Sequence, residues 1–375
     1  MKQIVFVVAG LIAATAVQAA EPVKIGITTV LSGPTADRGQ SEQYGAQLAI
    51  NRINAAGGVL GRRVEAYYSD NARTPAVGVA GVKRLIETEH VPVLIGALST
   101  PVTHAIMPVV AEAKIPLVIA TSAGQDFVDA SGVGGNDYAF KTIPSEVDIA
   151  RGLMRFLASK GAKSVAIVAA AGDFPQANAT AMAKAAAESN IRVTGQETLA
   201  QGTTDFAPVI DKLKAGAPDQ VVTVLGPFTA GFFKAYEASG WKVPLTGRIE
   251  FPAALGAVSP QFRAAGGLAD MTSVVNFTPL VEQPGIKDFV ADYSAHYGMM
   301  PTQRSFFVYE ATLLVVDAIR RAGSDQPADI QKALKATTMT SALGGTYAFN
   351  DHNHPKIPLP IVGLKDGKPT VIAMQ

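Results

Sequence analysis

Short apolar runs alternate with longer helix-like stretches along most of the chain, and this alternation restricts the fold more than any other feature of the sequence. The first apolar runs are rich in Val and Ile and lie at 23–30, 63–70, 91–98 and 115–121. The stretches between them have the spacing of amphipathic helices and lie at 41–58, 75–90 and 103–114. Apolar strands that alternate with helices indicate a parallel sheet covered by helices on both faces.

The same pattern restarts after a change-over at 140–146. A helix-like stretch at 145–162 is followed by an apolar run at 164–170, and strands and helices continue to alternate beyond it. The sequence therefore predicts an α/β protein with two doubly wound parallel-sheet lobes.

The last part of the chain is too short to form a third domain. It holds two more helix-like stretches and a closing β-rich stretch. We expect it to return to the first lobe, so that lobe 1 comprises 21–142 and 275–347 and lobe 2 comprises 143–274 and 348–375. This arrangement sends the chain between the lobes about three times and indicates a hinge.

The first 20 residues have the order of parts found in a secretory signal peptide. Lys2 is followed by an apolar stretch at 4–17 and by small residues before a cleavage point near Ala19 and Ala20. The apolar stretch is shorter than the ~20 residues of a membrane span. We therefore expect export, removal of residues 1–20, and a soluble mature protein in the periplasm.

Charge, cysteine content and motifs exclude several classes of function. Without Lys2 the 32 basic residues become 31, equal to the 31 acidic residues, so no basic excess points to nucleic acid. The chain has no Cys, so we expect neither disulfides nor a lipid on cysteine. The sequence has no phosphate-binding loop, nucleophile elbow or zinc-helix motif. We therefore expect no enzyme activity, no cofactor and no metal.

Six loops follow directly on apolar runs and share a small, polar, turn-forming character. They lie at 32–39, 96–104, 120–126, 170–176, 225–231 and 247–252. In open α/β sheets, ligands bind beyond the carboxyl ends of the strands, and helix N-termini at such loops attract anions. We expect the six loops to line a ligand-binding cleft between the lobes.

One ordered series of segments spans nearly the whole chain after the signal peptide. It consists of KIGITTVLSGPTADRGQSEQYGAQLAINRINAAGGVLGRRVEAYYSDN at 24–71, VPVLIGALSTPVTHA at 91–105, KIPLVIATSA at 114–123 and DFAPVIDKLKAGAPDQVV at 205–222. The series resembles the type I periplasmic solute-binding proteins of branched-chain amino acid ABC transporters, the leucine/isoleucine/valine-binding family. The resemblance implies a monomer whose hinged lobes close on an amino acid and deliver it to an ABC permease in the inner membrane.

The resemblance also implies binding residues in the loops of the first lobe. Ser99 and Thr100 match a segment that holds the ligand carboxylate. Thr121, Ser122 and Ala123 match a segment whose backbone groups and final hydroxyl hold the carboxylate and the ammonium, although Ala123 has no hydroxyl. Charge-assisted hydrogen bonds of this kind are worth roughly 1.5–3 kcal/mol each. The hydroxyls also suit helix capping, which is compatible with binding.

In the second lobe the resemblance indicates Glu250 as the acceptor for a ligand ammonium. Gln176 stands near the position of a family aromatic residue after the first strand of this lobe, and Arg38 replaces the aromatic residue of the first loop in lobe 1. Phe228 is a candidate for contact with the apolar part of the ligand, and core packing is the competing interpretation.

Two alternatives to amino acid capture stay open. Because a guanidinium pairs bidentately with a carboxylate, Arg38, with or without Arg248, favours an aromatic or other organic acid without an ammonium. The plainer interpretation places Arg38 at the rim of the cleft or in solvent, and Glu250 in an exposed loop. A clam-like protein can also act as a ligand sensor for a regulatory partner, but the signal peptide favours transport.

Overall fold

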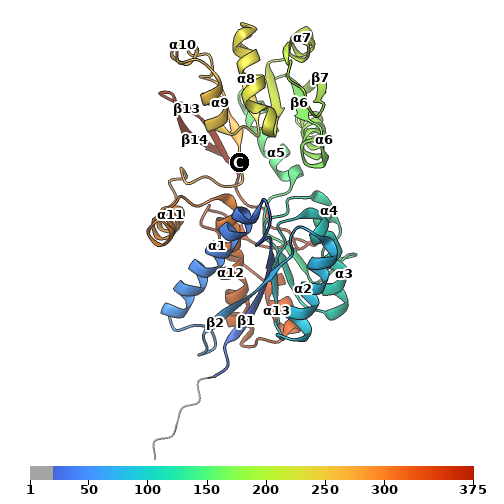
Figure 1. The fold of residues 1–375 in the computed structure, drawn as a ribbon, viewed down its shortest axis with the longest axis vertical. Helices are drawn as coiled ribbons and strands as arrows, with labels where there is room; N and C mark the ends of the chain where they lie inside the picture. The colour runs from blue at the N-terminus through green and yellow to red at the C-terminus, as the bar shows by residue number, and fades with distance from the viewer. Residues whose placement is uncertain (1–19) are drawn as a thin grey trace, which may run out of the picture.

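The computed structural model describes residues 20–375 and contains two lobes, one above the other in Figure 1. Each lobe has its own parallel sheet with helices on both faces. This confirms the predicted α/β class and the two doubly wound lobes. Within the described residues no helix is long and apolar enough to cross a membrane. The predicted signal peptide, apart from its last residue, lies outside the described part of the chain.

Lobe 1, the lower lobe in Figure 1, is built on a five-stranded parallel sheet with the order β2-β1-β3-β4-β5. Its strands are β1 (Val23–Thr29), β2 (Val64–Asp70), β3 (Leu94–Gly96), β4 (Leu117–Ile119) and β5 (Ala139–Lys141). All residues of β3, β4 and β5 are buried. Strands covered on both faces need continuous apolar runs, and this explains the Val- and Ile-rich segments of the sequence.

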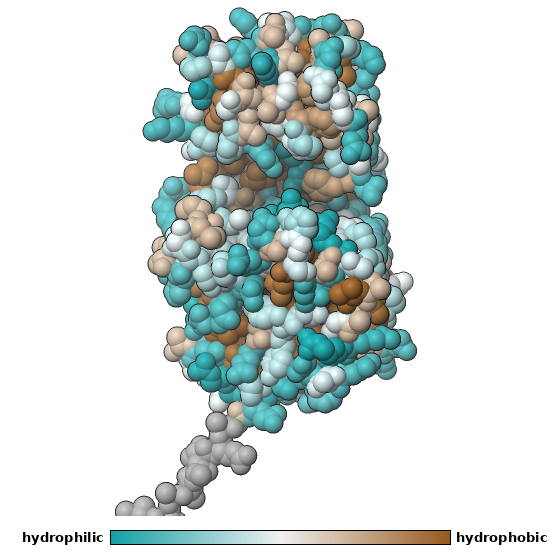
Figure 2. Space-filling model, viewed as in Figure 1, coloured by the Kyte–Doolittle hydropathy of each residue, from teal (hydrophilic) through white to brown (hydrophobic). Residues whose placement is uncertain are grey.

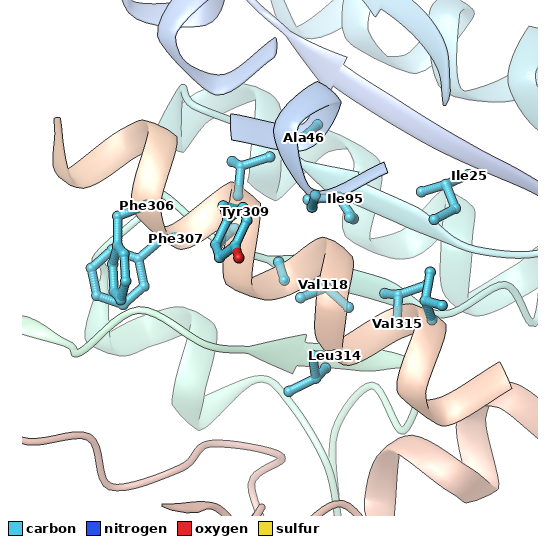
Figure 3. Packing of buried hydrophobic residues seen from close by; sticks show 14 of the residues in the cluster. Ile25, Ala46, Ile95, Val118, Phe306, Phe307, Tyr309, Leu314 and Val315 are labelled. Atoms are coloured by element: carbon cyan, nitrogen blue, oxygen red, sulfur yellow. The ribbon is translucent and has the colours of Figure 1, made fainter. Parts of the chain in front are cut away.

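Two helical layers enclose this sheet and form separate cores on its two faces. The helices of lobe 1 are α1 (Ala36–Ala55), α2 (Pro75–Glu87), α3 (Thr100–Ala113), α4 (Gln125–Asp129), α11 (Pro284–Tyr297), α12 (Gln303–Ala322) and α13 (Pro327–Lys335), and a short ribbon joins β11 (Met339–Thr340) to β12 (Thr346–Tyr347). Figure 3 shows Phe306, Leu314 and Val315 of α12 in one cluster with Ile95 and Val118 of the sheet. The late helices therefore complete the core that the first strands begin.

Helix α1 begins at Ala36, earlier than the sequence pattern indicates. The Ser-Gly-Pro turn leads straight into it, because the Ala36 N–H donates to the Gly33 carbonyl at 3.1 Å. The helix continues through Gly39. A Cβ at this position would lie 1.8 Å from the Val30 carbonyl oxygen, so glycine allows the helix to approach the end of β1. The helix thus packs directly on the end of β1, and Arg38 lies on a helical turn instead of in a loop.

Lobe 2 combines a parallel sheet of order β7-β6-β8-β9 with an antiparallel sheet of order β10-β13-β14. The strands are β6 (Ser164–Ala170), β7 (Arg192–Leu199), β8 (Gln220–Val224), β9 (Leu245–Gly247), β10 (Ser273–Val274), β13 (Pro360–Lys365) and β14 (Lys368–Met374). The hydroxyl oxygens of Thr246 and Thr272 lie 2.7 Å apart and join the end of the parallel sheet to the antiparallel one.

The helices of lobe 2 also lie on both faces of its parallel sheet. They are α5 (Glu146–Ser159), α6 (Asp173–Glu188), α7 (Ala207–Ala215), α8 (Thr229–Ala238), α9 (Phe251–Ala257) and α10 (Pro260–Ala264), with a 3₁₀ turn, η1 (Gly226–Phe228), before α8. Helices α5 and α6 share one core with the sheet, and α7, α8 and α9 share the other.

The chain passes between the lobes three times, as predicted. It does so between β5 and α5, after β10, and before β13. The third passage stays on lobe 1 for several residues: the ring of Phe349 lies 5.2 Å from that of Phe140, and the Asn353 carbonyl accepts a hydrogen bond from the Lys141 N–H at 2.9 Å. Ile357 still packs in the core of lobe 1, whereas Leu359 packs in a core of lobe 2.

A polar cluster fixes the first passage to the third. His354 Nε2 lies 2.7 Å from Asp148 Oδ2, and His354 Nδ1 lies 3.0 Å from the Lys141 carbonyl. Asp148 also accepts a hydrogen bond from the Ser145 N–H and closes the capping box of α5. Burial alone would raise the pKa of Asp148, but the hydrogen bond and charge of His354, with the Ser145 bonds, hold it well below its usual range.

Candidate ligand-binding cleft

Both parallel sheets direct the carboxyl ends of their strands toward the hinge. Lys141 ends β5 at the first passage, and Arg248, directly after β9, lies close enough to Glu146 at the start of α5 for the two charges to interact. Figure 2 shows a hollow between the two lobes at this level, with apolar side chains in its depth. We call this hollow the cleft. The loops that follow the strands border it from both lobes.

Ser99 and Thr100 form the start of α3, directly beyond β3. Ser99 is 3% exposed, and its hydroxyl does not cap the helix. Thr100 is exposed as the first helical residue. The N–H groups in the first turn of a helix have no acceptor within that helix. Pro101 has no N–H, and the Thr103 N–H donates to the Ser99 carbonyl at 2.9 Å, so Thr100 and Val102 supply the free N–H donors of this turn at the carboxyl end of the sheet. Contact of these residues with a ligand stays a prediction.

The second predicted loop divides into engaged and unengaged hydroxyls. Ser122 Oγ donates to the Ala97 carbonyl at 2.6 Å and lies 2.9 Å from Thr103 Oγ1, so its hydroxyl joins two loops of lobe 1 to each other. The Thr121 hydroxyl is buried and makes no hydrogen bond of normal geometry among residues 20–375, but it lies close enough to Glu42 to lower the pKa of that acid. Ala123 is half-buried. Of the two hydroxyls, that of Thr121 is the less engaged within lobe 1.

Glu42 on α1 is a buried acid at this edge of lobe 1 that the sequence analysis missed. Its side chain is 1% exposed; Oε2 accepts from the Thr29 hydroxyl at 2.6 Å, and Oε1 has no partner among the described residues. Burial raises the pKa of Glu42 to about 7, although the hydroxyls of Thr29 and Thr121 and the charge of Arg304 oppose the rise. An acid within an otherwise amphipathic helix carries no sequence signal of this kind.

Arg38 lies in a group of arginines at the rim of lobe 1. It is exposed and forms no ion pair among the described residues. Arg304, in the first turn of α12, is half-buried, and burial followed by the charge of Arg38 lowers its pKa. Arg73 adds a third positive charge to this environment, and the negative charges of Glu42 and Asp37 oppose the lowering. Arg304 is far from Arg38 in sequence, so the sequence alone does not bring the two together. The one local signal near Arg304 is the Thr302 capping box, which marks the start of α12.

Two predicted residues of lobe 2 are engaged with their own lobe. Gln176 Nε2 donates to the Ala170 carbonyl at 2.8 Å, and Gln176 Oε1 lies 3.5 Å from Thr198 Oγ1, so the amide spans the ends of β6 and β7. Phe228 is half-buried against the core, with its ring 6.2 Å from that of Phe206. The packing of Phe228 agrees with the competing interpretation of this residue.

Glu250 and Arg248 follow β9 within three residues but occupy different environments. Glu250 is exposed, precedes α9, and does not cap that helix. Arg248 is half-buried, its guanidinium carbon lies 5.4 Å from the ring centroid of Phe174, and its Nη1 is buried without a partner among residues 20–375. Burial lowers the pKa of Arg248 to about 10, while the negative charge of Glu146 acts against this.

The cleft therefore offers hydrogen-bond donors from one lobe and a positive charge from the other. Within the described residues no group of three His, Asp or Glu side chains has the arrangement of a metal site. His104 on α3 lies 2.7 Å from Asp126 and stacks at 4.5 Å on Phe127, in an exposed pair within lobe 1. An anion is the ligand that this set of groups suits best.

A fold of two doubly wound lobes around a cleft, with three passages between them, defines the class of clam-like proteins that close on a solute. The sequence profile described as periplasmic binding protein matches residues 22–368. The chain belongs to the periplasmic binding protein family.

Three relatives show how widely this similarity extends. The chain is 25% identical over 359 residues to the Leu/Ile/Val-binding protein homolog 3 of Brucella melitensis, with 92% of each chain covered. It matches the structure of the branched-chain amino acid transporter substrate binding protein from Streptococcus pneumoniae in complex with isoleucine, with a TM-score of 0.74, 24% identity and coverage of 95% and 99%. It also matches a solute binding protein from R. palustris in complex with benzoate, with a TM-score of 0.72, 20% identity and coverage of 94% and 96%.

Proposed function

We propose that this protein is the periplasmic substrate-binding component of an ABC importer. It captures a small carboxylate-bearing solute by closing its lobes and delivers the solute to a permease in the inner membrane. It acts as a monomer, after removal of the signal peptide, and catalyses no reaction. Family membership supports a binding role, and the cleft between the lobes supports capture of a small molecule.

One observation supports a carboxylate as the group that the protein binds. Both lobes present unused hydrogen-bonding groups where their strands end: the first turn of α3 and the Thr121 hydroxyl in lobe 1, and the guanidinium of Arg248 in lobe 2. A buried polar group without a partner costs free energy. A carboxylate between the lobes relieves that cost on both sides at once, and thus favours the closed state.

The relatives support the same chemical group. The names of the Brucella and Streptococcus proteins refer to branched-chain amino acids, and the R. palustris protein was crystallised with benzoate. Amino acids and benzoate differ in most respects, but both have a carboxylate. Among carboxylates, the relatives' names favour an amino acid.

We propose Ser99, Thr100 and Thr121, with the backbone of Ser122 and Ala123, as the carboxylate-facing surface of lobe 1. The Ser122 hydroxyl positions this loop through the Ala97 carbonyl, because it already has two partners. A Ser122→Ala variant would therefore weaken binding through loss of loop order, whereas Thr100→Val would remove a direct donor.

We also propose the lobe boundaries. The first two passages support changes of lobe near 142 and near 275, so that lobe 1 comprises 21–142 and the segment from 275. The contacts of Phe349, Asn353 and Ile357 with lobe 1 support a third change of lobe near 358, ten residues or so later than the predicted 347. Residues 359–375 then belong to lobe 2.

The test combines ligand-induced stabilisation with a measurement of closure. Purified mature protein is screened by thermal shift against aliphatic amino acids, their amides and simple organic acids, and hits are followed by small-angle X-ray scattering. A ligand at 100 times its dissociation constant stabilises the protein by roughly 2.7 kcal/mol, and closure lowers the radius of gyration. If only uncharged solutes such as amides or sugars stabilise the protein, the carboxylate proposal is wrong.

A further inference from the structure

Arg248 is a half-buried cation that forms no ion pair among the described residues. Its backbone N–H donates to the Thr223 carbonyl at 2.9 Å, which holds the residue at the end of β9, on the cleft side of lobe 2. The guanidinium lies over the exposed ring of Phe174, which belongs to the first turn of α6. Two separate loops of lobe 2 thus place this charge at the border of the cleft.

The charge has no partner within its own lobe. Nη1 is buried and makes no hydrogen bond with residues 20–375, and no carboxylate among those residues lies within 4.0 Å of the guanidinium. Glu146 is 7% exposed and is the acid whose charge reaches Arg248. Their separation is too large for an ion pair. A guanidinium with a buried, unpaired nitrogen is costly, so the retention of Arg248 at the cleft calls for an external acceptor.

The surroundings of Arg248 do not suit an ammonium. An ammonium near this guanidinium would meet like-charge repulsion at short range. The acid predicted to accept an ammonium, Glu250, is exposed beside α9 and is not part of the group formed by Arg248, Phe174 and Glu146. Lobe 1 carries both signs of charge at its rim, with Arg38 and Arg304 near Asp37 and Glu42, so it is the surroundings of Arg248 in lobe 2 that disfavour an ammonium.

The aromatic ring beside Arg248 indicates what accompanies the carboxylate. Phe174 is 49% exposed although it is a large apolar residue, and its ring lies under the guanidinium of Arg248. An exposed aromatic ring beside a cation forms a surface for an apolar group that carries an anion.

We propose that Arg248 binds the carboxylate of the transported solute and that the solute is a small apolar monocarboxylic acid without an α-ammonium, with an aryl or alkyl body against Phe174. This inference rests on the proposed function and narrows its substrate class. Arg248 is the specificity-determining residue of lobe 2, and the donors of lobe 1 complete the carboxylate site on closure.

Matched ligand pairs separate this inference from the proposed function. Leucine and 4-methylpentanoate differ in the α-ammonium alone, as do phenylalanine and 3-phenylpropanoate, and benzoate and benzamide differ in the charged oxygen. Isothermal titration calorimetry with wild-type protein is expected to detect at least one of the three acids, with an affinity at least 100-fold higher than that of its partner. Tighter binding of leucine or phenylalanine than of the matched acid overturns the inference and leaves the proposed function intact. No binding of any acid or amino acid overturns both.

Substitutions then test the residue. Arg248→Met keeps the length of the apolar stem and removes the charge, and it is expected to weaken acid binding at least 100-fold, whereas Arg248→Lys retains part of it. Arg38→Met is the matched control in lobe 1 and is expected to change affinity less than tenfold. Acid binding that survives Arg248→Met overturns the inference. If Arg248→Met does not fold, Arg248→Lys and the wild-type ligand pairs decide it.

The internal alternative, in which Arg248 pairs with Glu146 on closure, has its own test. Glu146→Gln is expected to leave acid binding unchanged or to tighten it, because it removes the one competing anion near Arg248. If Glu146→Gln abolishes binding in a protein that still folds by circular dichroism, Arg248 serves an internal ion pair, and the inference is wrong.

Discussion

Each lobe has one strand that ends on a glycine packed against the neighbouring strand, β3 in lobe 1 and β9 in lobe 2, and the residues that follow differ in chemistry. Gly96 at the end of β3 is paired with Thr28 of β1, and Gly247 at the end of β9 is paired with Thr223 of β8. Both glycines have positive φ, at 141° and 123°, and a Cβ on either would lie 2.3 Å from the neighbouring threonine carbonyl oxygen. A glycine with positive φ, packed against a threonine of the neighbouring strand, thus occurs at one strand end in each lobe.

The next residues make the difference between the lobes. After Gly96 the chain continues with small residues, Ala97 and Ser99, into the neutral donors at the start of α3. After Gly247 it continues with Arg248, which brings a full positive charge. The comparison teaches that the strand end fixes where a group is presented, and the side chain after it fixes what is bound. Four predictions test this division, in order of decreasing effect.

Alanine at either glycine is expected to cause the largest loss of stability. The added methyl group overlaps a backbone oxygen, and the residue must keep a positive φ, so Gly96→Ala and Gly247→Ala should each cost about 3–5 kcal/mol in the free energy of unfolding. Gly195→Ala is the control, because Gly195 lies on β7 with open space around its Cβ position. Urea unfolding measures the three. If all three variants lose equally little stability, the two strand ends do not require glycine.

Amide substitution of the two buried acids of lobe 1 is expected to change the free energy of unfolding by different amounts. Glu42 has one orphan oxygen, whereas Glu310 accepts hydrogen bonds from Ser341, Tyr347 and the Ala342 N–H. Burial raises the pKa of Glu42 to about 7, so its stabilising contribution is present below the unfolded pKa near 4.3 and is lost as the pH rises through 7.

At pH 8, Glu42→Gln should therefore be more stable than wild type by about 3–4 kcal/mol, and the two should converge at pH 4. Glu310→Gln should gain nothing at pH 8, because its amide NH₂ would face donors that need an acceptor. Denaturant unfolding at the two pH values measures both variants. A Glu42→Gln protein that is no more stable at pH 8 than at pH 4, relative to wild type, contradicts the assignment of Glu42 as an unsatisfied acid.

The polar cluster at the hinge is expected to contribute a smaller amount that depends on acid pH. The pKa of Asp148 is held below its usual range, so the contribution is present above the unfolded pKa near 3.9 and is lost as the pH falls below it. Asp148→Asn should destabilise the protein by about 1 kcal/mol at pH 7 through the weakened cap of α5. The deficit should vanish at pH 2, provided that the protein is still folded there, and a deficit that persists at that pH would assign the loss to packing.

The two cleft arginines are expected to differ slightly in the unliganded protein. Removal of the unpaired charge by Arg248→Met should raise the free energy of unfolding by about 1 kcal/mol, whereas Arg38→Met on the exposed turn should change it by less than about 0.5 kcal/mol. If both variants change the melting temperature equally, Arg248 is as well solvated as Arg38, and the two lobes do not differ in the way proposed.

The fold was largely accessible from the sequence, and the site was accessible only in part. The Val- and Ile-rich runs and the helices between them predicted both sheets, because a strand covered on both faces has few polar positions. The loops around Ser99, Thr121 and Arg248 were found for the same reason, since they follow such strands. Which hydroxyl in those loops is the less engaged could not be predicted: Ser122 is engaged by Ala97 and Thr103, and Thr121 is not.

By itself, the sequence determined the two-lobed α/β architecture, the three passages and the loops that border the cleft. These depend on local periodicity and on chain order. The tertiary structure alone decided that Glu42 keeps an orphan oxygen, that Arg304 lies beside Arg38, and that Arg248 lies over Phe174 without an anion. Burial and pairing of charges arise from contacts between segments far apart in the chain, and local patterns carry no information about those contacts.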